Sequence, residues 1–354
     1  MNDVNRKLTF ALIGCGNIAK KHLACIQGLS NAELVGVFDI DLESLQAFSE
    51  ENAIPGFSSI DMLLAEVNPD VIVVLTPSGS HASIVKNLAK YKKHIIVEKP
   101  ISLTLADAYE MKEECDRHGS TLSVVKQNRF NAPIRLARKM YDAGELGSLF
   151  LGTVRVRWSR DQNYYDSAAW RGTWENDGGV ICNQAIHHID MLQWFLGDVS
   201  SVFSSNINAV LDIEAEDTSV SVIKFTSGAL GIVEASTAIR PKDLEGSISL
   251  LGNKGSIEVG GFAMNKIVKL ELEDNSQIDQ KDKECSNPSN FAYAHIEFYK
   301  DYLSQILADK QPTINAEEAI KSLRIVHAIY KSHHENREVF LAEDDLQTKL
   351  GLED

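Results

Sequence analysis

A glycine-rich turn close to the N-terminus restricts the fold more than any other stretch. The apolar segment 8–14 (LTFALIG) runs into GCGNIA, which fits the pattern G-x-G-x-x-A at Gly14, Gly16 and Ala19. After a strand, the first glycine allows a tight turn, the second lets a pyrophosphate approach the backbone, and the small third residue lets the helix pack closely. Apolar residues at helical spacing and a second apolar strand at 34–38 follow. These features predict a dinucleotide-binding unit with phosphates at a helix N-terminus.

The end of the second strand indicates which dinucleotide binds. Asp39 lies 25 residues after Gly14 (39 − 14), near the spacing of the carboxylate that binds the adenosine ribose. The next residues, Ile40 and Asp41, offer no cation for a 2′-phosphate. We therefore expect NAD as the cofactor rather than NADP.

The stretch 94–100 (HIIVEKP) is an apolar run that ends in a carboxylate, an amine and a proline. Such a run is typical of a buried parallel strand, whose end emerges at the sheet edge where open α/β folds bind ligands. Desolvation and a nearby positive nicotinamide would both favour the neutral amine, so Lys99 could donate or accept a proton. The alternative is that Glu98 and Lys99 form a solvated strand end.

Two more apolar runs, at 70–75 and 121–126, end in polar turns. Repetition of strand, helix and strand brings all these strand ends to one edge of a parallel sheet. The residues expected to bind the cofactor at this edge are Gly14, Gly16, Asn17, Ile18, Asp39, Thr76, Pro77, His81, Glu98, Lys99 and Gln127.

The hydrophobic pattern of the sequence changes after Asn131. Long alternating segments between 150 and 251, with GNKG at 252–255 as a hairpin turn, predict antiparallel strands. Helical patterns return from Asn290. The expected class is α/β, with a doubly wound parallel Rossmann domain over residues 1–126. A substrate-binding and oligomerisation α+β domain with an open, mainly antiparallel sheet follows over 127–289, and C-terminal helices over 290–354 pack back on the first domain.

Composition excludes several classes of partner. A net charge of −15 over 354 residues argues against nucleic acid and acidic membrane surfaces, which need a basic footprint. No apolar stretch is long enough to span a bilayer and residues 1–7 are polar, so a cytoplasmic location is expected. The five cysteines are far apart, and the histidine pairs at 187–188 and 333–334 lack a third ligand at helical spacing. Neither a disulfide framework nor a metal site is expected.

Residues 177–190 (DGGVICNQAIHHID) open with a glycine turn and continue as a predicted helix. On that helix Asn183 and His187 are four residues apart and share a face. A lone histidine on a helix is more often structural than catalytic. With an amide one turn away and a candidate lysine in a cofactor domain, His187 becomes a reasonable acid or base.

The GCGNIA turn, the EKP strand end and the DGG…H..ID helix resemble the glucose-fructose oxidoreductase/inositol dehydrogenase/MocA family over nearly the whole chain. Within that family, VVKQNRFNAPI, WSRDQNYYD and WRGTWENDGGV are similar to the bacterial UDP-N-acetyl-2-amino-2-deoxyglucuronate 3-dehydrogenases of surface-polysaccharide synthesis. The resemblance implies a Rossmann domain, a C-terminal domain with an open sheet, bound NAD, and a homotetramer assembled through those sheets.

The resemblance also implies roles for individual residues. Lys99 matches the lysine of EKP and His187 the active-site histidine, while Trp170 and Arg171 match a Trp-Arg pair near the cofactor. The family's usual aspartate four residues before the histidine is Asn183 here. An amide can orient a hydroxyl but cannot take a proton, which leaves the base role to His187 or Lys99.

The expected reaction is NAD-dependent oxidation of the carbon-3 hydroxyl of a UDP-N-acetylglucosaminuronate-type nucleotide sugar to the 3-keto sugar, in lipopolysaccharide or O-antigen biosynthesis. Arginine binds carboxylates and phosphates bidentately, although each candidate arginine could equally be a surface charge. A dehydrogenase of a free sugar or inositol and a non-catalytic NAD-responsive binding protein are the alternatives. The expected substrate-binding residues are Lys99, Asn128, Arg129, Arg160, Tyr164, Asn183, His187 and Arg240.

Overall fold

The computed structural model describes residues 6–273, 286 and 292–352, and contacts between its elements divide the chain into two units. The first unit comprises residues 1–102, 106–127 and 291–319, and the second comprises 103–105, 128–290 and 320–354. Each unit contains one sheet, of six strands in the first and eight in the second. The predicted α/β class, with a Rossmann sheet and a mainly antiparallel sheet, is confirmed.

The first sheet has the strand order β3-β2-β1-β4-β5-β6, and every neighbouring pair is parallel. All four residues of β4 and the last three of β5 are buried. Continuous apolar runs of this kind are typical of parallel strands covered on both faces. The strands are β1 (Leu8–Ile13), β2 (Ala32–Phe38), β3 (Gly56–Phe57), β4 (Val71–Val74), β5 (His94–Val97) and β6 (Thr121–Val124).

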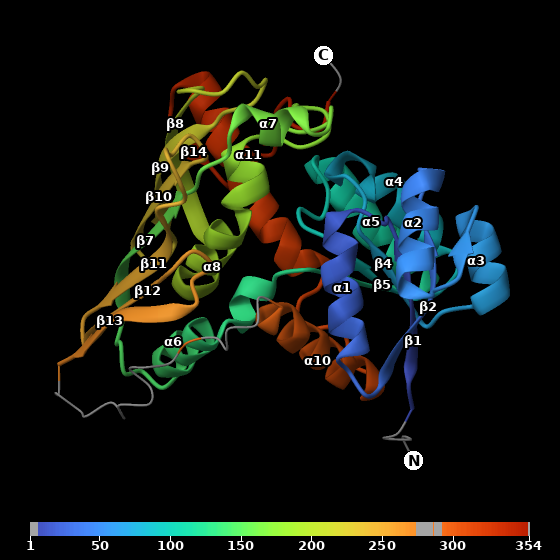
Figure 1. The fold of residues 1–354 in the computed structure, drawn as a ribbon. Coiled ribbons are helices and arrows are strands. Elements are labelled where there is room, and N and C mark those ends of the chain that lie inside the picture. The colour runs from blue at the N-terminus through green and yellow to red at the C-terminus, as the bar shows by residue number, and fades with distance from the viewer. Residues whose placement is uncertain (1–5, 274–285, 287–291, 353–354) are drawn as a thin grey trace. The chain divides into compact units, whose positions relative to one another are not determined.

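The helices of the first unit include one from far along the chain. Helix α10 (Tyr293–Leu307) packs against α1 (Asn17–Gln27), as Figure 1 shows. The rings of Tyr299 and Phe10 meet edge to face with centroids 5.9 Å apart. The predicted segment 290–354 is shared between the units, since residues 320–354 belong to the second. The other helices are α2 (Leu42–Asn52), α3 (Ile60–Val67), α4 (His81–Ala89) and α5 (Leu105–His118), with the 3₁₀ turns η1 (Ser78–Ser80) and η2 (Gln127–Phe130).

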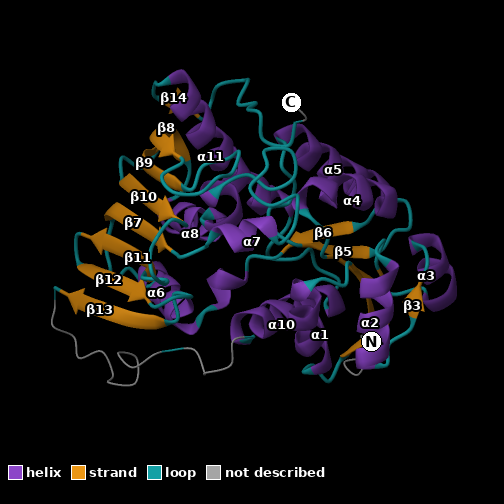
Figure 2. Ribbon diagram, turned by 45° about the horizontal axis from the view of Figure 1, so that its top comes forward, coloured by secondary structure: helices purple, strands orange, loops and turns teal. Residues whose placement is uncertain are grey.

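The second sheet has the order β13-β12-β11-β7-β10-β9-β8-β14, which can be followed in Figure 2. Its pairs are antiparallel except β7 with β10, which run parallel. The predicted hairpin turn at 252–255 joins β11 to β12, whereas the sequence did not predict β13 or β14. The strands are β7 (Leu149–Arg157), β8 (Val199–Ile207), β9 (Thr218–Phe225), β10 (Leu230–Ser236), β11 (Glu245–Gly252), β12 (Gly255–Gly260), β13 (Lys266–Leu272) and β14 (Val339–Phe340).

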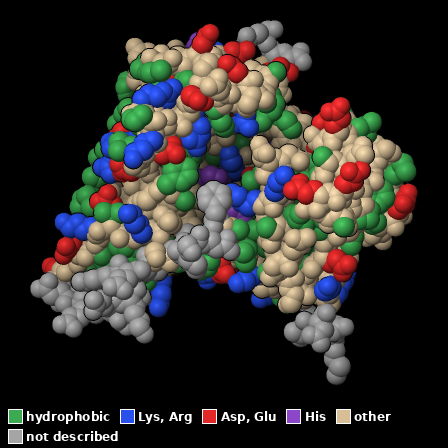
Figure 3. Space-filling view, in the orientation of Figure 1, with side chains coloured by type: hydrophobic (Ala, Val, Ile, Leu, Met, Phe, Trp, Pro, Cys, Tyr) green, Lys and Arg blue, Asp and Glu red, His purple; other side chains and the backbone are tan. Residues whose placement is uncertain are grey.

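The two faces of the second sheet differ. Helix α8 (Ile186–Leu196) covers one face so closely that a Cβ added to Gly152 of β7 would lie 2.6 Å from Cδ1 of Leu192. The other face carries Phe203, Val222 and Ile232, which are exposed and in register across β8, β9 and β10. Figure 3 shows hydrophobic side chains among charged ones over these strands, on the left of the view.

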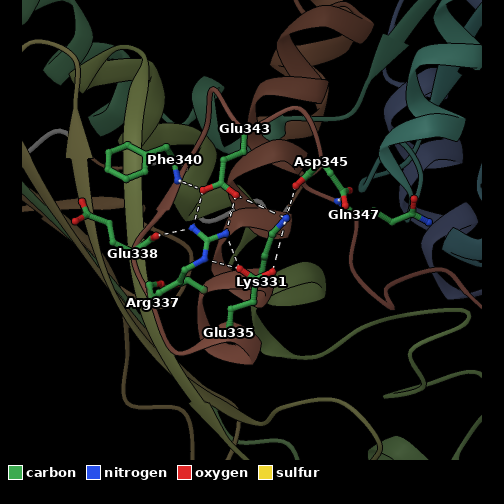
Figure 4. Close-up of polar contacts among 9 residues, drawn as sticks. Lys331, Glu335, Arg337, Glu338, Phe340, Glu343, Asp345 and Gln347 are labelled. Atoms are coloured by element: carbon green, nitrogen blue, oxygen red, sulfur yellow. Dashed lines mark hydrogen bonds and ion pairs between the residues drawn. The ribbon is translucent and has the colours of Figure 1, made fainter.

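The remaining helices of the second unit are α6 (Ala132–Asp142), α7 (Gln162–Asp166) and α11 (Ala316–Glu335). Ion pairs tie the end of α11 to the chain that follows (Figure 4). The guanidinium of Arg337 donates to Glu343 at 2.7 and 2.8 Å and to Glu335 at 2.6 Å, and Lys331 donates to the carbonyl of Asp345. Among the described residues, no helix is long and apolar enough to cross a bilayer.

Candidate functional site

The glycine turn after β1 has the geometry that the sequence predicts. Gly14 has a φ of +105°, and a Cβ there would lie 2.9 Å from the carbonyl of Leu75, so only glycine fits. Gly16 caps the N-terminus of α1 without a side-chain bond, and nothing lies within 4 Å of a Cβ added to it. With no acidic residue in its first turn, this helix start suits the pyrophosphate of a dinucleotide.

Asp39, the expected ribose ligand, is attached to the same turn. Its carboxylate accepts hydrogen bonds from the backbone N–H of Cys15 at 2.7 Å and of Asp41 at 2.9 Å. Burial, and secondarily the charge of Asp39, raise the pKa of the Cys15 thiol to about 12. The thiol is therefore protonated, and Asp39 is the charged group at this end of β2.

The loops after β4 and β5 are joined through His81. Its buried ring lies 2.9 Å from the carbonyl oxygen of Thr76 and 2.9 Å from that of Pro100, one at each nitrogen. Burial lowers the pKa of His81, while the two carbonyl acceptors favour the protonated ring. The structure gives His81 a supporting role at the edge where Thr76 and Pro77 are exposed enough to meet a ligand.

Glu98 is buried and bound on both oxygens. One oxygen lies 2.9 Å from Nε2 of His22, and the other accepts the backbone N–H of Lys99 at 3.0 Å. Burial alone would raise the pKa of Glu98, but the hydrogen bond of His22 and the charges of His22, His295 and Lys99 hold it well below its usual range. Glu98 is thus an ionised anchor for the backbone of Lys99.

Sequence reasoning missed the partners of this anchor. His22 belongs to α1, and its Nδ1 lies 2.7 Å from the hydroxyl of Tyr299 in α10. The ligand atoms of His22, Glu98 and His295 all lie within 4.8 Å of one another, which could hold a metal ion. Because both nitrogens of His22 are already hydrogen-bonded and the charge of Lys99 is felt at Glu98, we assign the group as an ion-pair network.

In the second unit, the predicted helix over 180–190 begins differently from the expectation. Residues Val180–Gln184 form a π-helix, and α8 follows from Ile186. Four residues are close to one full turn in either helix type, so Asn183 and His187 keep a common face. Within residues 180–190 these two alone are partly exposed. Single π turns occur frequently at functional sites.

Asp177 holds Asn183 in place, and sequence reasoning did not single it out. Its side chain is 1% exposed, accepts the amide of Asn183, and accepts the backbone N–H of Gly172 at 2.8 Å. A carboxylate just before a glycine turn was the one signal that could have identified it.

Glu216 lies under the same helix start. One oxygen accepts the backbone N–H of Ile181 at 2.9 Å and the hydroxyl of Tyr330 at 3.1 Å. Burial, against the effect of these hydrogen bonds, raises the pKa of Glu216 to about 7. Glu216 precedes β9 and Tyr330 lies in α11, so no local pattern connects either residue with the site.

The structure brings together four predicted site residues. Arg171 donates to the hydroxyl of Tyr164 at 2.7 Å, and its guanidinium lies 4.4 Å from the centre of that ring and 4.6 Å from that of Trp170. Arg160 lies 5.5 Å from the same Tyr164 ring. Two guanidinium groups therefore lie against one tyrosine ring, and that of Arg160 also pairs with Asp243 at 3.2 Å. Both groups can donate further hydrogen bonds to an anionic ligand.

Arg240 lies on the chain that pairs with this region. The backbone N–H of Arg160 donates to the carbonyl of Thr237 at 2.9 Å, and the Arg240 guanidinium donates to the carbonyls of Thr237 and Ile239 at 3.4 and 2.9 Å. The side chain of Arg240 is exposed and, among the described residues, forms no ion pair with a carboxylate. It remains a candidate for an anionic substrate.

Arg129 is bound differently. Its guanidinium is buried and donates to both oxygens of Asp190, at 2.7 and 2.8 Å, with the Trp194 ring 5.0 Å away. This bidentate pair fastens η2, which carries Asn128, to helix α8. The contact gives Arg129 a structural role, and its expected role in substrate binding stays a prediction.

The adjacent histidines 187 and 188 have different surroundings. His188 is fully buried beside Trp158, with ring centroids 5.8 Å apart, and neither ring nitrogen has a hydrogen-bond partner among the described residues. Burial lowers the pKa of His188 to about 3. His188 is therefore a neutral core residue, while His187 is the member of the pair that is partly exposed.

A cavity of about 510 Å³ borders Glu216. Trp174, Tyr330 and Lys349 are among its lining residues, with the Lys349 ammonium 4.2 Å from the centre of the Trp174 ring. Neither Asn183 nor His187 lines it. The cavity is therefore separate from the site that the sequence predicts.

Two family models match the chain. Residues 8–126 match the oxidoreductase family with an NAD-binding Rossmann fold, and residues 138–341 match the C-terminal alpha/beta domain of that family. Myo-inositol 2-dehydrogenase of Thermotoga maritima is 26% identical over 95% of this chain and 99% of its own length.

Solved structures are similar over the whole chain. The WlbA dehydrogenase from Bordetella pertussis, in complex with NADH and UDP-GlcNAcA, has a TM-score of 0.90 and 36% identity, covering 97% of this chain and 100% of the other. The WlbA dehydrogenase from Chromobacterium violaceum, in complex with the same two ligands, has a TM-score of 0.88 and 36% identity, covering 97% and 98%.

Proposed function

Because the chain belongs to the Gfo/Idh/MocA oxidoreductase family, whose first domain binds NAD, we propose that it oxidises the carbon-3 hydroxyl of a UDP-N-acetylglucosaminuronate-type nucleotide sugar to the 3-keto sugar. The observation that carries this proposal is the pair of arginines on Tyr164 in a chain 36% identical to proteins crystallised with UDP-GlcNAcA. A diphosphate and a sugar carboxylate are the anions that such a pair suits.

In this proposal each unit supplies part of the chemistry. Bound NAD would accept the hydride at its nicotinamide ring. Asn183 orients the reacting hydroxyl, His187 or Lys99 takes its proton, and the protonated Lys99 stabilises negative charge on the developing ketone oxygen. Glu98 sets the backbone of Lys99, and the π turn beginning at Val180 sets Asn183.

The proposal includes a homotetramer. Phe203, Val222 and Ile232 form an apolar row in register on the open sheet face, with 47%, 44% and 37% of the residue surface exposed. Burying such a row against other subunits would remove apolar area from water. Light scattering that shows a stable monomer at micromolar protein would contradict it. A cytoplasmic location and a role in surface-polysaccharide biosynthesis, both expected from the sequence, belong to the same proposal.

The test is a panel of sugars and nucleotide sugars in the presence of NAD. UDP-GlcNAcA should produce NADH and should raise the unfolding temperature, since a ligand at a hundred times its Kd stabilises by about 2.7 kcal/mol. UDP alone separates the contribution of the diphosphate from that of the sugar. NADH formation with UDP-GlcNAcA that is no faster than with free glucuronate would overturn the assignment of a nucleotide sugar.

A free sugar or inositol is the second candidate substrate. The observation in its favour is the 26% identity with a myo-inositol 2-dehydrogenase over almost the full length of both chains. Such a neutral ligand would not need the arginines on Tyr164. Myo-inositol oxidation that survives Arg160→Gln unchanged, with no response to UDP-GlcNAcA, would favour this candidate.

A further inference from the structure

Asp177 contacts two parts of the second unit's candidate site. The residue is 1% exposed, and its carboxylate accepts the side-chain amide of Asn183 with one oxygen and the backbone N–H of Gly172 with the other at 2.8 Å. One buried charged group therefore fastens the helix that leads to His187 and the turn that carries Arg171. Hydrogen bonds to an ionised acceptor are stronger than neutral ones.

The contact fixes which way the Asn183 amide points. An ionised carboxylate can only accept hydrogen bonds, so the NH₂ group of Asn183 faces Asp177. The carbonyl oxygen of Asn183 then lies on the opposite side of the amide group. Asn183 is one of two partly exposed residues in 180–190, and an amide oxygen has two lone pairs, so it can accept a substrate hydroxyl beside any other contact that it makes.

The second contact sets the neighbouring turn. Gly172 has a φ of +70°, and a Cβ there would lie 3.0 Å from Cβ of Ile213, so the turn is closely packed. Arg171 immediately precedes it and reaches the hydroxyl of Tyr164 at 2.7 Å. Holding the N–H of Gly172 therefore holds the backbone from which the Arg171 guanidinium extends.

We propose that Asp177 is a positioning residue that presents Asn183 to the substrate as a hydrogen-bond acceptor and keeps Arg171 in the same site. The inference rests on the proposed function, because it concerns how that substrate's hydroxyl and anionic groups are held. Asp177 itself touches no reacting atom.

Two other ionisable groups near Asp177 affect how a substitution at position 183 changes the charge of the site. Glu216 and Tyr165 are buried, and burial together with the charge of Asp177 raises the pKa of Glu216 to about 7 and of Tyr165 to about 12. A second carboxylate at position 183 would lie close to Asp177. Repulsion between the negative charges would then keep a proton on one of the carboxyl groups there. We therefore expect the pH profile of turnover to change most in Asn183→Asp, which places two carboxylates side by side, and less in the exchanged pair, which has one.

The decisive variants are Asp177→Asn and the exchange Asp177→Asn/Asn183→Asp. In the single variant, the new amide donates to position 183, so Asn183 turns its NH₂ group toward the substrate. Turnover of UDP-GlcNAcA should then fall about tenfold or more, as for other lost preorganised contacts. In the exchange, the amide at position 177 binds one oxygen of the new carboxylate at position 183, and the other oxygen again faces the substrate. Turnover should recover to within about threefold of the wild type, with a shifted pH profile.

A matched control is Asp217→Asn. Asp217 is fully buried, and its carboxylate accepts the backbone N–H groups of residues 209, 210 and 211 at 2.8 to 2.9 Å and the hydroxyl of Thr218 rather than any group of Asn183 or Gly172. This variant should lower the unfolding temperature and leave turnover unchanged at a temperature well below it. If turnover in all the variants simply follows their unfolding temperatures, Asp177 is structural and the inference fails.

A second readout needs no substrate. Hydrogen exchange at the amide of Gly172 should accelerate in Asp177→Asn, because the amide oxygen that remains is a weaker acceptor than a carboxylate, and should not accelerate in Asp217→Asn. A wild-type enzyme that does not oxidise UDP-GlcNAcA would overturn the proposed function while leaving this exchange test in force. Unchanged exchange and unchanged turnover in Asp177→Asn would overturn the inference. Should that variant fail to fold, the exchanged pair compared with Asn183→Ala decides, since equal turnover in both would also overturn it.

Discussion

Glu98 in the first unit and Glu216 in the second are both buried glutamates, with 9% and 4% of their surface exposed. Their ionisation nevertheless differs. The hydrogen bond of His22 and three nearby positive charges outweigh burial at Glu98 and hold its pKa well below the usual range. At Glu216 the partners are a backbone N–H and a tyrosine hydroxyl, and burial raises the pKa to about 7.

The difference shows that the partners, and not burial alone, decide the charge of an interior carboxylate. Glu98 is an anion that binds the backbone N–H of Lys99. Glu216, whose pKa is raised by burial to about 7, supports the first turn of the helix that leads to His187. Each glutamate thus supports one candidate catalytic group, by a charge in one unit and by hydrogen bonds in the other.

The largest effect on the rate of oxidation should come from removing the side chains of Lys99 and His187 themselves. Lys99→Ala and His187→Ala should each slow oxidation about a hundredfold or more, the usual size of a general acid or base contribution, with little change in NAD affinity. Because two groups acting on one hydroxyl work as a unit, the double variant should be far less impaired than the product of the single effects implies. Near-wild-type turnover in both single variants, with normal sugar binding, would rule out the mechanism.

Glu98→Gln should destabilise the first unit strongly. The variant leaves the charges of His22, His295 and Lys99 without their carboxylate, and breaking a buried pair costs about 3 to 5 kcal/mol. Since the folded pKa of Glu98 is depressed, its contribution is present above the unfolded pKa and is lost as pH falls. Urea unfolding at several pH values should therefore show that the difference in free energy of unfolding between variant and wild type is smaller in acid. A gap that widens on acidification would contradict the ion-pair assignment.

Glu216→Gln should have the opposite pH dependence. The folded pKa is raised, so the stability that Glu216 contributes is complete below its ordinary pKa of 4.5 and is lost as pH rises through about 7. At 1.36 kcal/mol per pKa unit, the wild type loses about 3 kcal/mol from this group, and the variant loses none. As the pH is raised from mildly acidic to mildly alkaline, the free energy of unfolding of the variant should increase relative to that of the wild type. Parallel stability curves for the two proteins would show that Glu216 is ionised throughout.

Asp39, a partly exposed carboxylate of the first unit, should show the smallest of these effects. NAD should bind better than NADP, because a 2′-phosphate would face this charge. Asp39→Asn removes the charge and keeps an acceptor for only one of the N–H groups of Cys15 and Asp41, which bind different oxygens, so the preference should shrink by about tenfold, or 1.4 kcal/mol. Fluorescence titration with both cofactors measures this. Equal wild-type dissociation constants for NAD and NADP would remove Asp39 from the cofactor site.

Much of the first unit could be predicted from short segments. The glycine turn, the acidic end of β2 and the apolar run before Lys99 each lie within one strand and its following turn, and repetition of that unit fixes a parallel sheet with its strand ends on one edge. In the second unit the alternating strands, the hairpin turn at 252–255 and the helix bearing His187 were also predicted. Local periodicity suffices for such elements because it reports which face of a strand or helix is buried.

The sequence by itself determined the glycine geometry, the strand ends that carry Asp39 and Lys99, and the spacing of Asn183 and His187. Only the tertiary structure decided the partners that charge or orient these groups. Tyr299 reaches His22 across 277 positions, and Tyr330 reaches Glu216 across 114. Likewise, the π turn before His187, the buried pair of Arg129 with Asp190, and the unlike surroundings of Glu98 and Glu216 depend on segments far apart in the chain. A side chain's charge responds to every group within a few ångströms, and sequence patterns describe only the neighbours along the chain.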